Sequence, residues 1–120
     1  MPEELSLGAL QRRLERFDAE RGWDAVQPVH TALHLMEELG EVARELLILT
    51  GYKTPDADAR GRLEGELSDV TLLIFKLASQ HGIDLERAVL EKMSANDARF
   101  PVSESQAAMA VYVEHRLEKS

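Results

Sequence analysis

The segments HLMEELGEVARELL at residues 34–47 and RLEGELSDVTLLIFKLA at residues 62–78 decide the fold of this chain. In both, apolar residues recur at the period of an α-helix. Each carries two carboxylates three residues apart, and residues at i and i+3 share one face of a helix. The connection TGYKTPDADARG, residues 50–61, is short, so we expect antiparallel neighbouring helices. Four carboxylates would then converge between them: Glu38, Glu41, Glu66 and Asp69.

Four converging carboxylates indicate a cation site, because like charges repel and an unpaired buried carboxylate is costly. Oxygen ligands in a chain without cysteine suit Mg²⁺ or Mn²⁺ rather than zinc. The alternative is a solvated acidic face. Periodicity argues against it, because Glu66 falls on an apolar stripe and Glu38 shares a stripe with His34, which we expect to line the acidic pocket. Arg62, four residues before Glu66, leaves partial pairing open. The polar face of the second helix is expected elsewhere, at Gly65, Ser68, Lys76 and Ser79.

The rest of the chain also has helical patterning, so the sequence predicts an all-α fold. Helices are expected over residues 5–21, 28–50, 60–81 and 85–99, separated by Gly22, Gly82 and Pro101. The tail, residues 103–120, is expected to form a shorter helix capped by Ser103, packing on the bundle or on a partner chain. We therefore predict a single domain over residues 1–120, a bundle of four main helices with a C-terminal helical extension.

Composition narrows the function classes. A chain of 120 residues, 44% hydrophobic and 30% charged, fits one domain, and so short a helical chain often completes its core by oligomerising. It has no cysteine, no signal-peptide pattern and no apolar run as long as a membrane span, so we expect a cytoplasmic protein with no membrane partner. A formal charge of −8 opposes a nucleic-acid polymer. It is compatible with a small phosphorylated substrate bridged by a divalent cation.

Three polar residues near the end of the fourth helix form a second candidate site. Lys92, Asn96 and Arg99 are spaced i, i+4 and i+7, which places them on one stripe. Such a stripe is usually a solvated face, but two cations and an amide could also grip a triphosphate. Trp23, the only tryptophan, is by residue type a core or interface anchor. Lys53 in the connection is interpreted as a solvated loop lysine.

Taken together, these motifs resemble those of the MazG-like all-α nucleotide pyrophosphohydrolases. The signature of that family is Glu-x-x-Glu, a spacer and Glu-x-x-Asp, and here the phrases are Glu38-Leu-Gly-Glu41 and Glu66-Leu-Ser-Asp69, followed by Lys92-x-x-x-Asn96-x-x-Arg99-Phe-Pro. The segments at residues 16–23, 35–46 and 68–102 are most similar to the dCTP-pyrophosphatase branch. The resemblance covers roughly residues 10–102.

The resemblance implies a Mg²⁺-dependent hydrolase, with Mn²⁺ as a possible substitute. Its metal would be held by the four carboxylates, and it would convert a nucleoside triphosphate to the monophosphate and pyrophosphate. Lys92, Asn96 and Arg99 would hold phosphates and sugar, and Trp23 would help to form the base pocket. The assembly would be a homodimer or a homotetramer.

Several points stay open at this stage. A fifth carboxylate, Glu37 or Glu45, could act as general base. A pyrimidine deoxynucleoside triphosphate is the favoured substrate, in a role of nucleotide-pool clean-up. Leu73 stands where dCTP-preferring relatives place an aromatic residue, and the chain extends past Pro101, so the base is undecided. The alternatives are an enzyme like phosphoribosyl-ATP pyrophosphohydrolase and a non-enzymatic helical interaction module.

Overall fold

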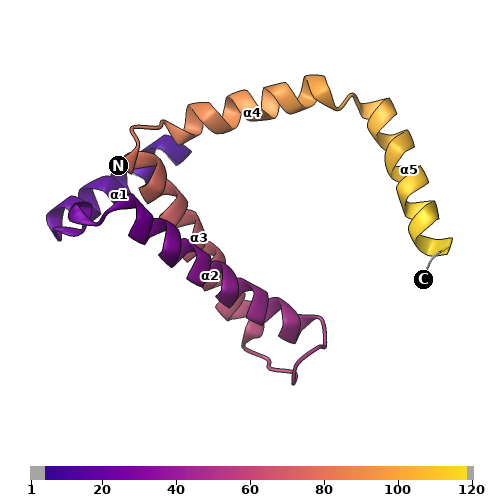
Figure 1. Ribbon diagram of the computed structural model, residues 1–120, viewed down its shortest axis with the longest axis horizontal. Coiled ribbons are helices and arrows are strands. Elements are labelled where there is room, and N and C mark those ends of the chain that lie inside the picture. The colour runs from indigo at the N-terminus through magenta and orange to yellow at the C-terminus, as the bar shows by residue number, and fades with distance from the viewer. Residues whose placement is uncertain (1–4, 119–120) are drawn as a thin grey trace. The chain divides into compact units, whose positions relative to one another are not determined.

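The computed structural model describes residues 5–118, with side chains for residues 5–116, and the secondary structure of this part consists of helices joined by turns and short connections, without strands (Figure 1). The all-α prediction is confirmed. The helix bounds differ from the predicted ones by at most two residues. The elements are α1 (Leu7–Glu20), the 3-10 turn η1 (Trp23–Ala25), α2 (Pro28–Leu49), α3 (Ala59–Gln80), α4 (Leu85–Arg99) and α5 (Val102–Glu118).

The chain divides into two compact units, Met1–Glu86 and Arg87–Ser120. The first unit holds α1, η1, α2 and α3, and the second holds most of α4 together with α5. That the whole chain forms one domain stays a prediction. No helix among the described residues is both long enough and apolar enough to span a membrane.

In the first unit, α2 and α3 run side by side as an antiparallel pair (Figure 1). Pro28 occupies the start of α2, where its missing N–H costs nothing. Buried Val70 and Phe75 place the apolar face of α3 inward. The connection is tied to both helices by Arg62, whose Nε donates to both oxygens of Glu45 at 3.0 Å and whose terminal nitrogen donates to Asp56 at 2.8 Å.

Helix α1 packs along α3 through a buried glutamine. The Gln11 side-chain nitrogen donates to the carbonyl of Ile83 at 2.8 Å and to the Ser79 hydroxyl at 3.1 Å. Its oxygen accepts from the backbone N–H of Leu85 at 3.1 Å. At the start of α1, the Ser6 hydroxyl accepts from a backbone N–H, as an N-cap does. Gln11 therefore joins α1 to the end of α3 and the start of α4.

Two predictions about helix ends have different outcomes. Gly22 follows α1 as predicted, with a φ of 73°, which glycine adopts without the steric cost that a Cβ brings. The predicted cap at Ser103 is wrong, because α5 begins one residue earlier, at Val102. Ser103 therefore lies inside the first turn. The packing of α5 on a bundle or a partner stays a prediction, and residues 119–120 lie outside the described part of the chain.

Candidate metal and nucleotide site

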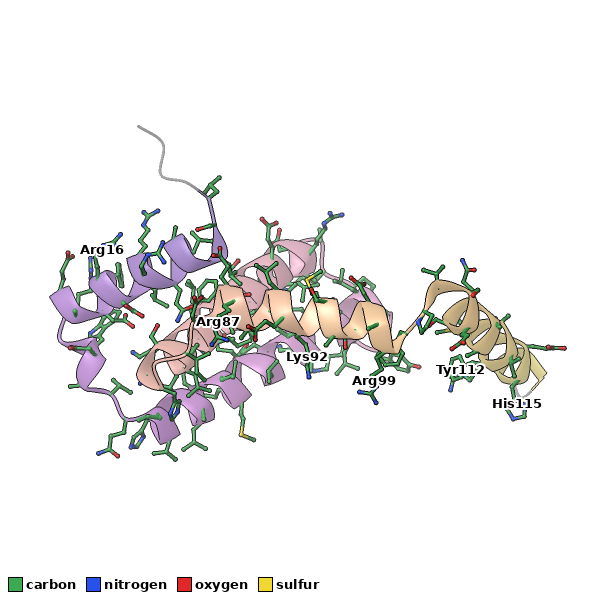
Figure 2. The ribbon with its side chains drawn as sticks, turned by 90° about the horizontal axis from the view of Figure 1, so that it is seen from above. Arg16, Arg87, Lys92, Arg99, Tyr112 and His115 are labelled. Carbon is green, nitrogen blue, oxygen red and sulfur yellow. The ribbon has the colours of Figure 1, made fainter. Side chains whose placement is uncertain are left out.

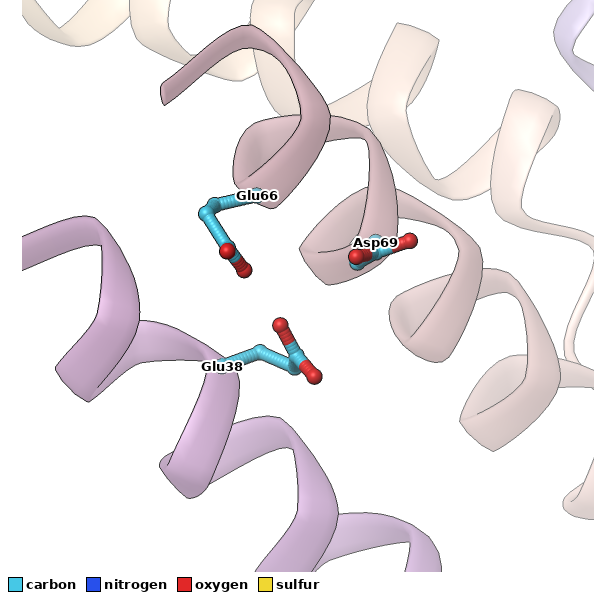
Figure 3. A group of neighbouring side chains, drawn as sticks. All are labelled: Glu38, Glu66 and Asp69. Atoms are coloured by element: carbon cyan, nitrogen blue, oxygen red, sulfur yellow. The ribbon is translucent and has the colours of Figure 1, made fainter. Parts of the chain in front are cut away.

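Three of the four predicted carboxylates come together between α2 and α3. Glu38 projects from α2, and Glu66 and Asp69 project from α3 toward it (Figure 3). One carboxylate oxygen from each residue lies within 4.8 Å of the other two. Glu38 and Glu66 are half-buried and Asp69 is exposed. Oxygen atoms this close together can share one cation, and the set contains only the hard ligands that Mg²⁺ and Mn²⁺ prefer.

Glu41, the fourth predicted ligand, is exposed and is not part of this group of three. It lies one turn beyond Glu38 on α2. Its charge nevertheless contributes to raising the pKa of Glu66, so it lies near enough to add its field to the group. The assignment of all four carboxylates as metal ligands stays a prediction.

The proximity of the carboxylates raises the pKa of Glu66 to about 7. The largest cause is a hydrogen bond shared with the Glu38 carboxyl, followed by partial removal from water and by the charges of Glu38, Glu41 and Asp69. Each of these causes disfavours the ionised form of Glu66. Near neutral pH the cluster therefore holds a proton, which a divalent cation would displace.

His34 lies one turn before Glu38 and contacts it. Its Nε2 atom is 3.3 Å from a carboxylate oxygen of Glu38, in an i, i+4 pair on the surface of α2. Its side chain is half-exposed. His34 thus lies beside the acidic group, as predicted from its spacing.

A cavity of about 520 Å³ opens beside the carboxylates. Its wall includes Glu38, Asp69 and His34 together with Trp23 and Leu73. The Trp23 ring meets the Phe17 ring edge to face, with the ring centroids 5.8 Å apart. Trp23 is half-exposed, so its surface remains available to a ligand. An apolar, aromatic wall next to a group of carboxylates fits a flat base whose phosphates are bound through a cation.

No protein-family profile matches the chain. The chain is 36% identical over 117 residues to dCTP pyrophosphatase 1 of Rattus norvegicus, an alignment that covers 92% of this chain and 68% of that protein. The same-named protein of Bos taurus is 35% identical over 117 residues, covering 92% of this chain and 69% of the relative. The same-named protein of Homo sapiens is 34% identical over 116 residues, covering 92% of this chain and 68% of the relative.

This chain belongs to the dCTP pyrophosphatase family. The family is the branch of the MazG-like nucleotide pyrophosphohydrolases to which the motifs pointed, so that prediction is confirmed. The chain is accordingly a hydrolase of phosphoanhydride bonds, and the alternative of a non-enzymatic interaction module is not supported.

The two residues considered as general base in such an enzyme differ in environment. Glu45 is buried, and both of its oxygens accept from Arg62 at 3.0 Å. The sequence left open whether Arg62 pairs with Glu66. In the structure Arg62 binds Glu45 and Asp56 instead, and Glu66 lies with Glu38 and Asp69. Glu37 is exposed on α2. Glu45 therefore holds Arg62 between α2 and α3, and which of the two carboxylates could act as general base stays a prediction.

The predicted phosphate-binding residues lie in the second unit. Lys92, Asn96 and Arg99 are exposed on α4, and their side chains project from that helix (Figure 2 labels Lys92 and Arg99). The Arg99 guanidinium lies 5.1 Å from the centroid of the Phe100 ring. Because these residues and the carboxylates belong to different units, the phosphate-binding role stays a prediction.

Two residues of the cavity wall were missed by sequence reasoning. Asp18 and Lys76 line the same cavity as Trp23, and their side chains are only 10% and 16% exposed. Lys76 was expected on the polar face of α3, and in the structure this part of that face contacts Asp18 and the Trp23 carbonyl instead of solvent. The one sequence signal was its spacing, since Lys76 follows Asp69 by seven residues and so shares its stripe.

Proposed function

We propose that this enzyme hydrolyses a deoxynucleoside triphosphate between its α and β phosphates, releasing the monophosphate and pyrophosphate, with Mg²⁺ as cofactor. The observation that carries the proposal is the convergence of Glu38, Glu66 and Asp69 within 4.8 Å. Two of the three, Glu38 and Asp69, also line the cavity that Trp23 lines. The names of the curated relatives support the reaction class.

The residues present fit Mg²⁺. The donors are carboxylate oxygens from two rigid helices, and the raised pKa of Glu66 marks a cluster whose negative charge is not compensated. In the proposed site Glu38, Glu66 and Asp69 would hold the ion, with Glu41 as the fourth ligand, and Mn²⁺ could substitute. When bound, the metal would supply charge neutralisation at the phosphates and a bound water of lowered pKa.

The protein's own side chains would bind and orient the nucleotide. Trp23 would stack on the base, as an aromatic surface in a half-open cavity can. Lys92 and Arg99 would offset the charge that develops on the departing pyrophosphate, and Asn96 would donate to the sugar or a phosphate. The α2–α3 pair would fix the carboxylates in place, and preorganised charge is the largest part of catalysis in phosphoryl transfer.

A pyrimidine base, with dCTP as the first candidate, is proposed on one ground, and Leu73 bears only on which pyrimidines would fit. Curated relatives carry dCTP in their names. The cavity of about 520 Å³ has Leu73 in its wall, at the position where an aromatic residue was expected in dCTP-preferring relatives. Leucine leaves more room there, so modified pyrimidines are included in the proposal. The role would be nucleotide-pool clean-up in the cytoplasm.

The functional unit is proposed to be a homodimer or homotetramer. Helix α2 presents Glu38 toward α3, and its opposite face carries Val29, Leu33 and Met36, which are 58%, 57% and 67% exposed. A helix that is apolar on both faces is normally covered on both. A second copy of this chain supplies the matching apolar face, and one closed two-fold contact would cover both copies.

The reaction is tested with a panel of canonical and modified nucleotides in Mg²⁺, with the products separated by ion-exchange chromatography. Monophosphate and pyrophosphate are expected, and Glu38→Gln should lower kcat by at least about a hundredfold. Glu64→Gln is the matched control, because Glu64 is exposed on α3 and lies outside the group of carboxylates. Release of orthophosphate and a diphosphate would contradict the proposed bond. Phosphoribosyl-ATP belongs in the same panel, since preferred turnover of it would favour the alternative enzyme.

A further inference from the structure

One stripe of α3 carries a carboxylate of the proposed metal site. The same stripe carries the side chains that contact the 3-10 turn η1, here called the Trp23 turn. Asp69, Leu73, Lys76 and Gln80 follow at i, i+4, i+7 and i+11, which places them on one face of the helix. Lys76 lies about 10 Å along the helix axis from Asp69, at 1.5 Å per residue.

Lys76 binds the first residue of the Trp23 turn. Its ammonium nitrogen lies 3.2 Å from the carbonyl oxygen of Trp23, to which it donates, and 3.5 Å from a carboxylate oxygen of Asp18 on α1. Both charged side chains are largely buried. A partly buried ammonium with one charged and one neutral acceptor is restricted in position, so the carbonyl of Trp23 is fixed relative to α3.

Gln80 binds the other end of the same turn. Its side-chain nitrogen donates to the carbonyl oxygen of Val26 at 2.9 Å. Val26 is the C-cap of the 3-10 turn that begins at Trp23. Two side chains one helical turn apart on α3 therefore hold the two ends of the segment that carries the tryptophan. We call these two contacts, from Lys76 and Gln80 to the Trp23 turn, the clamp. Within the first unit, the clamp joins the cavity wall to the helix of Glu66 and Asp69.

The clamp also forms the boundary between two cavities. Lys76 and Asp18 line the cavity of about 520 Å³ beside the carboxylates and also a smaller one of about 250 Å³, whose wall includes Gln80. If the Trp23 turn were released from Lys76, it could move toward either space. The Lys76–Asp18 ion pair therefore lies between the proposed nucleotide cavity and the smaller cavity.

We infer that Lys76, supported by Asp18 and Gln80, is a positioning residue that sets the distance between the base-stacking surface of Trp23 and the carboxylates. It contacts the backbone of the turn and takes no part in the phosphoryl transfer. The inference rests on the proposed function for the identity of the ligand. Its specific consequence is that loss of the clamp weakens binding of the base and leaves the chemical step in place.

The test uses Lys76→Met, which keeps the length of the side chain and removes the ammonium. Because this change leaves Asp18 buried without its partner, the double variant Asp18→Asn/Lys76→Met is made in parallel and removes both charges. Gln80→Leu removes the second contact alone. Lys53→Met is the matched control, since Lys53 is an exposed lysine of the connection between α2 and α3. Far-ultraviolet circular dichroism establishes that each variant is helical.

The first readout is the fluorescence of the free protein, without metal or nucleotide, because Trp23 is the only tryptophan. We expect a red-shifted emission and stronger acrylamide quenching in the double variant, and wild-type behaviour in Lys53→Met. The second readout is steady-state kinetics on deoxynucleoside triphosphates. KM should rise about tenfold and kcat should stay within twofold, as expected when a charged hydrogen bond that positions a binding surface is lost.

Each outcome decides the inference. Unchanged emission and quenching in the double variant would overturn the clamp. Changed emission with an unchanged KM would overturn the link from the clamp to the base, and a loss confined to kcat would assign Lys76 to the chemical step. If wild-type protein hydrolyses no nucleotide in the panel, the proposed function fails separately, and the fluorescence comparison still decides whether Lys76 holds the Trp23 turn.

Discussion

The raised pKa of Glu66 should make the stability of the protein depend on pH, and this dependence can be measured without any substrate. Its pKa is raised from 4.5 to about 7 by the hydrogen bond with Glu38, by partial burial and by the neighbouring charges. The folded protein therefore binds more protons than the unfolded chain between these two pH values. By linkage, the stability of the metal-free protein falls as pH rises through that window.

The melting temperature of metal-free wild type should therefore decrease as the pH rises from 5 to 8, and that of Glu66→Gln should decrease less. Above pH 7 the variant should melt higher than wild type without metal, because one repelling charge is gone. Adding millimolar Mg²⁺ at pH 8 should stabilise wild type and have little effect on the variant. Thermal melts of Glu64→Gln supply the control, and an unchanged pH slope in Glu66→Gln would contradict the assignment.

Glu45 and Glu37 lead to opposite expectations for substitution by glutamine. Glu45 is buried and accepts two hydrogen bonds from Arg62, so Glu45→Gln should lower the melting temperature by several degrees while kcat stays within about threefold. Glu37 is exposed, so Glu37→Gln should leave the melting temperature unchanged. If Glu45→Gln instead reduced kcat a hundredfold in a fully folded protein, Glu45 would be the general base after all.

At the residue scale, the sequence predicts those features of the site that depend on spacing within one helix. Glu66 and Asp69 share a face because they are spaced i, i+3, and His34 contacts Glu38 because they are spaced i, i+4. The partners of Arg62 and Lys76 could not be predicted. Arg62 contacts Glu45 across 17 positions and Lys76 contacts the Trp23 carbonyl across 53, and which side chains meet over such spans depends on how the helices pack.

At the scale of the helices, Gln11 is the contact with the most specific consequence. One buried amide satisfies a backbone carbonyl near the end of α3, the Ser79 hydroxyl and the first backbone N–H of α4. Gln11→Ala would leave two backbone groups without these partners, which should cost about 2–3 kcal/mol of unfolding free energy. Urea unfolding followed by circular dichroism measures this loss.

The companion variant Glu15→Ala should change the unfolding free energy by less than about 0.5 kcal/mol, because Glu15 is exposed one turn further along α1. Equal losses in Gln11→Ala and Glu15→Ala would mean that general helix stability, rather than the bridge, accounts for the effect.

The helix ends follow local rules, which is why they could be predicted so closely. Gly22 and Gly82 both have positive φ after their helices, and Pro28 opens α2. Ser103 shows the limit of such rules, because a serine followed three residues later by glutamine predicts a cap wherever it occurs. In the structure α5 already begins at Val102, directly after Pro101. Capping residues identify a helix start to within a residue, and the choice between adjacent positions depends on the preceding turn.

At the scale of the whole molecule, the exposed apolar residues on the outer face of α2 predict a contact between copies of the chain. Val29, Leu33, Met36, Gly40 and Leu47 follow at helical spacing on one stripe. The stripe lies on the side of α2 away from Glu38 by the same spacing rule. At Gly40 a Cβ would meet no atom within 4 Å, so the protomer itself does not require glycine there. A glycine on an apolar stripe would let a partner helix approach closely, as small residues do between packed helices.

Substitution of Gly40 therefore tests association between copies without disturbing the fold of the protomer. Sedimentation of wild type at micromolar concentration should show a species heavier than the 13.5 kDa protomer. Gly40→Leu should leave or raise the helicity of the protomer, because leucine favours helix by up to about 1 kcal/mol over glycine, yet it should weaken association at least tenfold. Leu33→Glu should act likewise by placing a charge in the interface, and Glu64→Lys should sediment as wild type. A wild-type protein that is active as a monomer, or a Gly40→Leu variant with unaltered association, would show that α2 is not the contact between copies.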